Sequence, residues 1–427
     1  MPEPLYRSRP GGFEIKPASQ PVARRINDFI YLSEGFSNSF LVLTREGRVV
    51  INTGMGFEAP VHRRNFDAVD GRPIRYILLT QGHVDHVGGV DVFREPGTKV
   101  VAQAHNAAHQ AEDALLQPFR SARSAFAFGE SVGQGIRANL QTFGGALPPQ
   151  ARPTPTITFE DRYAFELGGL HFELLSVPGG ETLDSLVVWL PEHRICFSGN
   201  LFSALFGHFP NLVTIRGDRY RDALRFVASL DRVLALEPDL LLVGHHDPVE
   251  GRGVIHAELT RLRDAVRYVH DETVRGMNAG KDVWTLMRDI ELPAALDVGE
   301  GYGKVSWCVR AIWENYAGWF HHRSTTELYP QAPWTVHPDL VELAGGPDAV
   351  AQRARAKLDA GAPVEAVQLA EVALTAAPRH RGALETSLLA HERLESASTN
   401  FWLTSWLRHR IHGLRAALAE DDSAGQR

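Results

Sequence analysis

The segment RYILLTQGHVDHVGG, residues 75–89, gives the first indication of the architecture of this chain. Its opening five residues are apolar or β-prone and predict a buried strand. Two imidazoles and one carboxylate, on His83, His86 and Asp85, follow within four residues. Open α/β sheets bind ligands at the carboxyl ends of their strands, and zinc and related divalent ions prefer imidazole and carboxylate ligands, so a metal site is expected here. The preceding strand and the following glycine pair make a polar loop with incidental histidines the weaker interpretation.

Composition places the chain among ordinary globular proteins. Its 427 residues are too many for one compact core, so about two or three domains are expected. Apolar residues make up 44%, and the net charge is −7 without a run of lysine or arginine, so nucleic acid and membrane surfaces are not expected partners. No apolar segment is long enough to span a membrane or to act as a secretion signal. Cys196 and Cys308 lie far apart in apolar segments, which favours buried thiols in a reducing compartment and a cytoplasmic protein.

Apolar segments of strand length lie on both sides of residues 75–89 and predict an α/β domain. Turn residues such as Glu46-Gly47 separate them. An amphipathic helix is predicted over 218–236, with six apolar residues between Leu224 and Leu234 on one face. The expected strands are 29–32, 39–43, 48–52, 75–79, 99–102, 172–177, 186–190, 194–197 and 239–243.

Changes in composition along the chain predict its domains. Residues 1–24 are rich in proline and arginine and form an N-terminal arm, residues 25–253 form the α/β domain, and residues 254–427 are helical. Residues 104–155 interrupt the strands with an insertion of helical and then glycine- and proline-rich composition, which we expect to cover the site or to bind substrate. The tail predicts paired helices of tetratricopeptide-like pitch at 347–360, 363–377, 380–397 and 400–418.

Further candidate ligands follow glycine-bearing turns at the ends of other strands. They are Glu181, Asn200 and His245. Each alone is equally well explained as a turn residue, but together with the histidines at 83 and 86 they favour a metal site at one edge of the sheets. His208 and His246 are additional imidazoles near these positions, and each is either a proton donor or a packed bystander.

The cluster at residues 83–86 resembles the His-x-His-x-Asp-His signature of the metallo-β-lactamase superfamily, with Gln81 in place of the first histidine. The stretch NLVTIRG, residues 211–217, is similar to the Asn-Leu-Tyr-Thr-Leu-Arg-Gly stretch of the alkylsulfatase branch of that superfamily. Residues 301–320, with the triplet GYG and an aromatic run, are similar to the dimerisation domain of the same branch. The resemblance covers residues 25–417 and implies an αββα metallo-β-lactamase sandwich followed by an all-α helical dimerisation domain. It also implies that the sterol-carrier-like module usual in this family is lacking.

The resemblance implies two zinc sites, one made by Gln81, His83 and Glu181 and the other by Asp85, His86 and His245, with Asn200 between them. Two positions depart from the family, because amides replace a histidine at 81 and the bridging carboxylate at 200. An amide is neutral and has one good oxygen donor, so two ions would be held less tightly or one site would be empty. The second set keeps two imidazoles and a carboxylate, a composition that suits catalytic zinc and also non-haem iron. We therefore expect one or two zinc ions per chain, with iron or manganese as alternatives.

By the same resemblance, Asn211 and Arg216 bind the sulfate group of a substrate. A guanidinium fork and an amide donor suit an oxyanion. The alternative is that Arg216 pairs with an acid at the start of the 218–236 helix. We expect Asp85 and His245 to act in catalysis together with this pair.

These features predict a metal-dependent hydrolase of the alkylsulfatase type, which cleaves a sulfate ester or a similar anionic ester with water activated by the metal. The substrate is expected to be a small anionic molecule whose apolar part lies against the 104–155 insertion, with Phe126 and Phe128. Two alternatives stay open. One is another reaction on the same fold, namely lactone, amide or phosphoester hydrolysis or an iron-dependent oxidation, and the other is a non-catalytic binding protein with a degraded metal site. The aromatic content of the helical half and the resemblance predict a homodimer.

Overall fold

The structure, a computed structural model, describes residues 3–424, with side chains up to residue 420. Residues 1–2 of the predicted arm and residues 425–427 of the predicted helical region lie outside the described residues. The chain divides into two compact units, Met1–Gly318 and Trp319–Arg427.

The first unit extends beyond the domain limit that the sequence suggests after residue 253. Three helices from Arg252 onward pack on the core of the unit through side chains such as Leu262, Val266 and Cys308. Their burial explains why the compact unit continues to Gly318. The three helices are α6 (Arg252–Asn278), α7 (Val283–Asp289) and α8 (Val305–Ala317).

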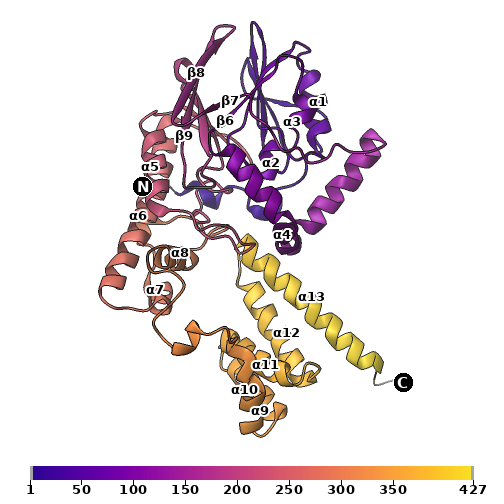
Figure 1. The fold of residues 1–427 in the computed structure, drawn as a ribbon, viewed down its shortest axis with the longest axis vertical. Coiled ribbons are helices and arrows are strands. Elements are labelled where there is room, and N and C mark those ends of the chain that lie inside the picture. The colour runs from indigo at the N-terminus through magenta and orange to yellow at the C-terminus, as the bar shows by residue number, and fades with distance from the viewer. Residues whose placement is uncertain (1–2, 425–427) are drawn as a thin grey trace. The chain divides into compact units, whose positions relative to one another are not determined.

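Two mixed β-sheets form the centre of the first unit (Figure 1). The seven-stranded sheet has the order β1 to β7, antiparallel from β1 to β4 and parallel from β4 to β7. Its strands are β1 (Arg24–Arg25), β2 (Ile30–Ser33), β3 (Ser39–Thr44), β4 (Gly47–Ile51), β5 (Ile74–Leu78), β6 (Lys99–Gln103) and β7 (Ile157–Phe159). The six-stranded sheet has the order β13-β12-β11-β10-β9-β8, in which β11 and β12 run parallel and the other neighbours antiparallel. Its strands are β8 (Arg162–Leu167), β9 (Leu170–Ser176), β10 (Leu186–Leu190), β11 (Ile195–Gly199), β12 (Leu240–Val243) and β13 (Val249–Glu250).

The strands that lead to the site are buried on both faces. All of β4 is buried, and in β5 only Arg75 is exposed. The two strands pair in parallel with Ile51 opposite Leu78, so their carboxyl ends lie at the same edge of the sheet. Asn52 and Thr80 follow these ends, and the main-chain N–H of Thr80 donates to Asn52 Oδ1 at 3.0 Å. This hydrogen bond fixes the start of the loop that carries the motif.

Three apolar cores give the unit its four layers of helix, sheet, sheet and helix (Figure 1). One core lies between the sheets and contains Leu78 and Phe197. The second lies under the helices on the seven-stranded sheet and contains Phe66 and Phe93, and the third lies under the helices on the six-stranded sheet and contains Phe226. This arrangement confirms the predicted αββα fold. The covering helices are α1 (Ala59–Asp67) and α3 (Val90–Phe93) on one side and α5 (Ala223–Leu234) with α6 on the other.

All the strands predicted from the sequence are present, within about two residues of the expected bounds. The prediction missed the two-residue strands β1 and β13 and also β7 and β8, and β8 alternates exposed with half-buried residues instead of forming an apolar run. Helix α5 begins at Ala223 and not at residue 218, because the Asp222 side chain caps it by accepting the N–H of Arg225 at 2.9 Å. The prediction that Leu224 belongs to the apolar face was wrong, since this side chain is 40% exposed.

The predicted insertion contains one long helix, α4 (Asn106–Phe143), followed by extended chain up to β7. Near its start, the Gln110 amide donates to the carbonyl of Gly82 at 2.8 Å. Further along, Arg123 donates to the carbonyl of Arg216 at 2.6 Å. The helix therefore contacts two segments that carry predicted site residues.

The second unit is helical, as predicted. Its consecutive helices pack closely through small side chains, and Ala366, Ala370, Ala373 and Ala390 are fully buried. Across the described residues, no helix combines the length and the apolar character needed to cross a membrane. The helices are α9 (His337–Leu343), α10 (Pro347–Asp359), α11 (Pro363–Ala376), α12 (Arg381–Ser396) and α13 (Phe401–Ala424).

Candidate metal centre and oxyanion site

The predicted ligands lie on segments that leave the ends of several strands. Helix α2 (Val84–Val87) follows β5 and carries Asp85 and His86, and His245 follows β12. The residue before His245 is Gly244, and a Cβ atom on it would lie 1.9 Å from Asn200 Oδ1. Glycine is therefore needed at 244 for the ends of β11 and β12 to approach each other.

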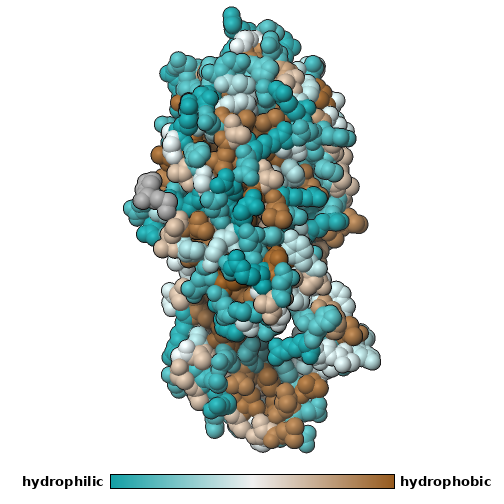
Figure 2. Space-filling model, turned by 90° about the vertical axis from the view of Figure 1, so that its left-hand side faces the viewer, coloured by the Kyte–Doolittle hydropathy of each residue, from teal (hydrophilic) through white to brown (hydrophobic). Residues whose placement is uncertain are grey.

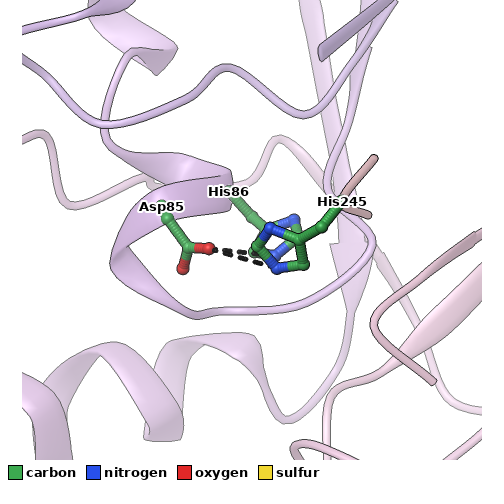
Figure 3. A group of neighbouring side chains, drawn as sticks. All are labelled: Asp85, His86 and His245. Atoms are coloured by element: carbon green, nitrogen blue, oxygen red, sulfur yellow. Dashed lines mark ion pairs between the residues drawn. The ribbon is translucent and has the colours of Figure 1, made fainter. Parts of the chain in front are cut away.

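The side chains of Asp85, His86 and His245 converge on one point (Figure 3). Their ligand atoms all lie within 4.8 Å of one another. Asp85 Oδ2 is 3.5 Å from His86 Nε2 and 3.9 Å from His245 Nε2, and the two imidazole centroids are 6.0 Å apart. Three side chains in this arrangement can share one divalent ion.

In this group of three side chains, the triad, the two histidines are buried and Asp85 is half-buried. Burial lowers the pKa of His86 and that of His245 to about 3, and it raises the pKa of Asp85. Both ring nitrogens of His86 and Nδ1 of His245 are buried without a hydrogen-bond partner in the described part of the chain. Buried polar atoms left in this state reduce stability unless a ligand engages them. The donor set and its unpaired atoms therefore fit a divalent ion.

Gln81, His83 and Glu181 contact one another. The Gln81 Nε2 amide lies 2.9 Å from His83 Nδ1, and Gln81 Oε1 accepts the main-chain N–H of Asn200 at 3.1 Å. Glu181 Oε2 lies 3.3 Å from His83 Nδ1 and 3.1 Å from Arg221 Nη2. Burial raises the pKa of Glu181 and holds the pKa of His83 well below its usual range. The predicted ligands thus form two groups, the triad and this hydrogen-bonded network.

Asn211 and Arg216 present unpaired polar atoms to the same region. Asn211 is 1% exposed, and within residues 3–424 its side-chain oxygen and nitrogen have no hydrogen-bond partner, nor does Arg216 Nε. The charge of Arg216 acts to lower the pKa of Asp85 and of Glu181, which places the guanidinium near both carboxylates. A buried amide and guanidinium with unused donors are suited to hold an oxyanion.

The alternative role for Arg216, an ion pair with a nearby acid, accounts for only part of its surroundings. Arg216 Nη2 lies 3.9 Å from Asp218 Oδ2. Asp218 Oδ1 is closer to another arginine, Arg120 of α4, at 3.1 Å. Asp218 is thus shared, and Arg216 keeps donor capacity for a ligand.

Two residues that the sequence analysis did not assign also lie at the site. Arg221 is 8% exposed, and its Nη1 donates to the main-chain carbonyl of Asn211 at 2.8 Å. Burial raises the pKa of Tyr302, and the carboxylates of Glu181 and Asp85 add to this rise, so a neutral phenol lies beside the centre. The sequence signal for Tyr302 is the GYG triplet at residues 301–303.

A groove of about 560 Å³ reaches Glu181 from the surface. Its walls come from the first turns of α4, residues 218–225 and helices α6 and α8, and include His109, Arg219 and Tyr316. The groove gives a small molecule access to this side of the site.

The remaining predicted neighbours have structural contacts. His208 Nδ1 accepts the N–H of Gly301 at 2.9 Å, and His246 Nε2 lies 3.1 Å from the carbonyl oxygen of Gly11. Both imidazoles are thereby tied to the main chain, which favours the packed-bystander interpretation. Phe126 and Phe128 are half-buried on α4.

Comparison with known proteins gives matches along most of the chain. Residues 32–245 match the metallo-beta-lactamase superfamily, and residues 285–416 match the alkyl sulfatase dimerisation family. A linear primary-alkylsulfatase of Pseudomonas sp. is 30% identical over 379 residues, which are 84% of this chain and 71% of that protein. An alkyl/aryl-sulfatase of Saccharomyces cerevisiae is 25% identical over 83% of this chain and 57% of its own length. An (R)-specific secondary-alkylsulfatase of Pseudomonas sp. is 26% identical over 83% of this chain and 56% of its own length.

A solved structure, that of the stereoselective inverting sec-alkylsulfatase Pisa1 from Pseudomonas sp., has a similar fold. The TM-score is 0.81 at 22% identity, over 93% of this chain and 66% of that one. The chain therefore spans between about half and 71% of the length of these relatives. From the extent of these matches, the chain belongs to the metallo-beta-lactamase superfamily and, within it, to the alkylsulfatase family.

Proposed function

We propose that this protein is a metal-dependent hydrolase that cleaves an alkyl sulfate ester. The observation that carries the proposal is the position of Asn211 and Arg216, which have unused polar atoms, near the metal-ligand triad, whose imidazoles also have unpaired nitrogens within the described residues. One group of residues suits a divalent cation and the other suits an oxyanion, which is the combination that hydrolysis of an anionic ester requires. The alkylsulfatase relatives support sulfate as the oxyanion.

Asp85, His86 and His245 would hold the metal ion. When bound, a divalent ion at this position lowers the pKa of water to near neutrality and so supplies hydroxide. The three side chains contribute a fixed, desolvated pocket in which both imidazoles are already unprotonated at neutral pH, because burial lowers the pKa of each to about 3. No proton has to leave either histidine before it ligates. The ligand types suit zinc, with iron or manganese as the alternatives.

Arg216 and Asn211 would hold the sulfate group with the guanidinium Nε–H and the side-chain amide, atoms that are unused within the described residues. Tyr302, whose phenol stays protonated because burial raises its pKa, would donate to the leaving oxygen. The apolar chain of the ester would extend along α4, where Phe126 and Phe128 are half-buried.

The proposal is tested by sulfate release from dodecyl sulfate and from a secondary alkyl sulfate, before and after treatment of the protein with a chelator. Arg216→Lys removes the planar fork and is expected to lower kcat/KM by about 100-fold. Arg162→Lys is the matched control, because Arg162 is 57% exposed and pairs with Glu173 on the neighbouring strand β9, and neither residue lines the groove. Its rate is expected to be unchanged.

Sulfate release that chelation does not reduce would contradict the metal role. Hydrolysis of a lactone or a phosphoester in preference to either sulfate would contradict the substrate assignment. Metal analysis of the active protein identifies the ion. Iron or manganese in place of zinc would change the proposed metal, and the proposed hydrolase activity would stand.

We also propose that the protein is a homodimer, as the match of residues 285–416 to an alkyl sulfatase dimerisation family suggests. Exposed apolar side chains in the second unit support this proposal; they include Leu328, Tyr329, Trp334, Val336, Leu340 and Leu343. Figure 2 shows apolar side chains gathered at the lower end of the view. The cytoplasmic location predicted from composition stays a prediction, which cell fractionation tests.

A further inference from the structure

We propose that this chain holds one divalent ion per monomer, on Asp85, His86 and His245, and that Gln81, His83 and Glu181 form a metal-free network held by Arg221. The inference deepens the proposed function and rests on it. It departs from the pair of zinc sites that the family resemblance implies. Three features of the network support it.

The first feature is the orientation of the Gln81 amide. A main-chain N–H is always a donor, so the Gln81 atom that faces the N–H of Asn200 at 3.1 Å must be the oxygen. The amide nitrogen therefore faces His83 Nδ1 at 2.9 Å and donates to it. Gln81 offers N–H groups, and not a lone pair, at the position where a metal ligand is needed.

The second feature is the state of the His83 imidazole. Nδ1 is the ring nitrogen on the side of Glu181, at 3.3 Å from its Oε2. An imidazole nitrogen has one lone pair in the ring plane, and the amide hydrogen of Gln81 already occupies that of Nδ1. An ion between His83 and Glu181 would have to displace this hydrogen bond, because the unpaired nitrogen of His83 is Nε2 and not Nδ1. In the triad, His86 Nε2, the nitrogen 3.5 Å from Asp85 Oδ2, is itself unpaired within the residues described.

The third feature is the charge around Glu181. Its Oε2 lies 3.1 Å from Arg221 Nη2, and both side chains are almost completely buried. The same guanidinium donates through Nη1 to the carbonyl of Asn211 at 2.8 Å. Arg221 thus already neutralises the one carboxylate of the network, and a second cation would face that positive charge in a poorly solvated region. Asn200 contributes no charge that could offset this repulsion.

The metal content of the protein tests the inference. The purified protein is saturated with zinc, dialysed and analysed by mass spectrometry for metal per chain, and cobalt(II) titration is followed by visible absorbance. We expect one equivalent in both measurements. The double variant Gln81→His/Asn200→Glu, which restores an imidazole and a carboxylate, is expected to bind two.

Single variants locate the ion. His245→Ala is expected to lose it, and His83→Ala is expected to keep one equivalent. His109→Ala is the matched control for His83, because its ring lies 5.5 Å from that of His83 and outside the network contacts described above. Thermal unfolding confirms that each variant is folded before its metal content is compared.

The outcomes for metal and for activity are separable. Two equivalents in the unmodified chain, with one lost in His83→Ala, would overturn the inference even if alkyl sulfates are hydrolysed. One equivalent that is lost in His245→Ala supports the inference, even if no sulfate is released and the proposed function fails. No bound ion at saturating zinc would overturn both.

Discussion

The guanidinium of Arg221 lies 3.1 Å from the carboxylate of Glu181, and the two side chains are 7% and 5% exposed. Through its other nitrogen, Arg221 also holds the main-chain carbonyl of Asn211. This buried pair therefore joins the network of Gln81, His83 and Glu181 to the loop that carries Asn211.

Loss of the Arg221 charge is expected to destabilise the fold. Arg221→Met leaves the Glu181 carboxylate buried and unpaired, which costs about 3 to 5 kcal/mol of the free energy of unfolding. Urea denaturation measures the change. Arg232→Met, which removes a pair with Asp161 whose carboxylate is 77% exposed, is the control and should cost about 1 kcal/mol or less. Equal losses in the two variants would contradict the assignment.

Tyr302→Phe is expected to slow alkyl sulfate hydrolysis by about 100-fold, because the variant lacks the hydroxyl that donates to the leaving oxygen. Burial raises the pKa of this phenol, so the rate of the unmodified protein should show no loss from its ionisation up to at least pH 9. Metal content should be unchanged in the variant. An increase in KM with an unchanged kcat would assign Tyr302 to substrate binding instead.

Stability should fall below neutral pH through His208. Burial lowers the pKa of this imidazole from 6.5 to about 4, and Nδ1 must be unprotonated to accept the N–H of Gly301. The unfolded chain therefore binds a proton that the folded chain does not, so stability is complete above pH 6.5 and is lost as the pH falls towards 4.

For this single histidine, the free energy of unfolding changes with pH by at most about 1.4 kcal/mol per pH unit. Urea denaturation of chelator-treated protein at pH 7 and pH 5 measures it. His208→Gln keeps an acceptor for Gly301 and should show a smaller slope than the unmodified chain. If stability depends on pH equally in both proteins, His208 does not cause the loss of stability at low pH.

The dimer is expected to depend on the exposed apolar side chains of the second unit. Leu340→Glu/Leu343→Glu places charges on side chains that are 47% and 85% exposed, and should convert the dimer to a monomer in light-scattering measurements. Val22→Glu, at a side chain 65% exposed and outside the matched dimerisation residues, is the control. If the unmodified protein is a monomer in solution, the proposed homodimer is wrong.

The layers of the fold were predictable because the core strands are continuous apolar runs bounded by glycine and polar turns. The strand β8 was missed because only one of its faces is partly buried, which weakens the hydrophobic signal. Asp85 and His86 are close in sequence, and the strand-end rule brought His245 to them. This rule predicts only that the three side chains lie at the same edge of the sheets. The distances between them depend on tertiary packing.

The sequence could not give the roles of Arg221 and Tyr302. Each is defined by contacts with segments far along the chain, as in the pairing of Arg221 with Glu181. Whether Gln81 offers oxygen or nitrogen is likewise set by a main-chain N–H more than a hundred residues away. The spacing of residues within a motif does not reveal contacts between such distant segments.

Helix α4 is fixed on one side and free on the other. Its inner side is bonded to the carbonyls of Gly82 and Arg216, beside the motif and the oxyanion pair. Its outer side carries Leu115, which is 79% exposed. Substitutions on the outer side are therefore expected to leave the Gly82 and Arg216 segments in place, whereas substitutions at Gln110 or Arg123 would release one of them, so the two sides of one helix differ in how much sequence change they tolerate.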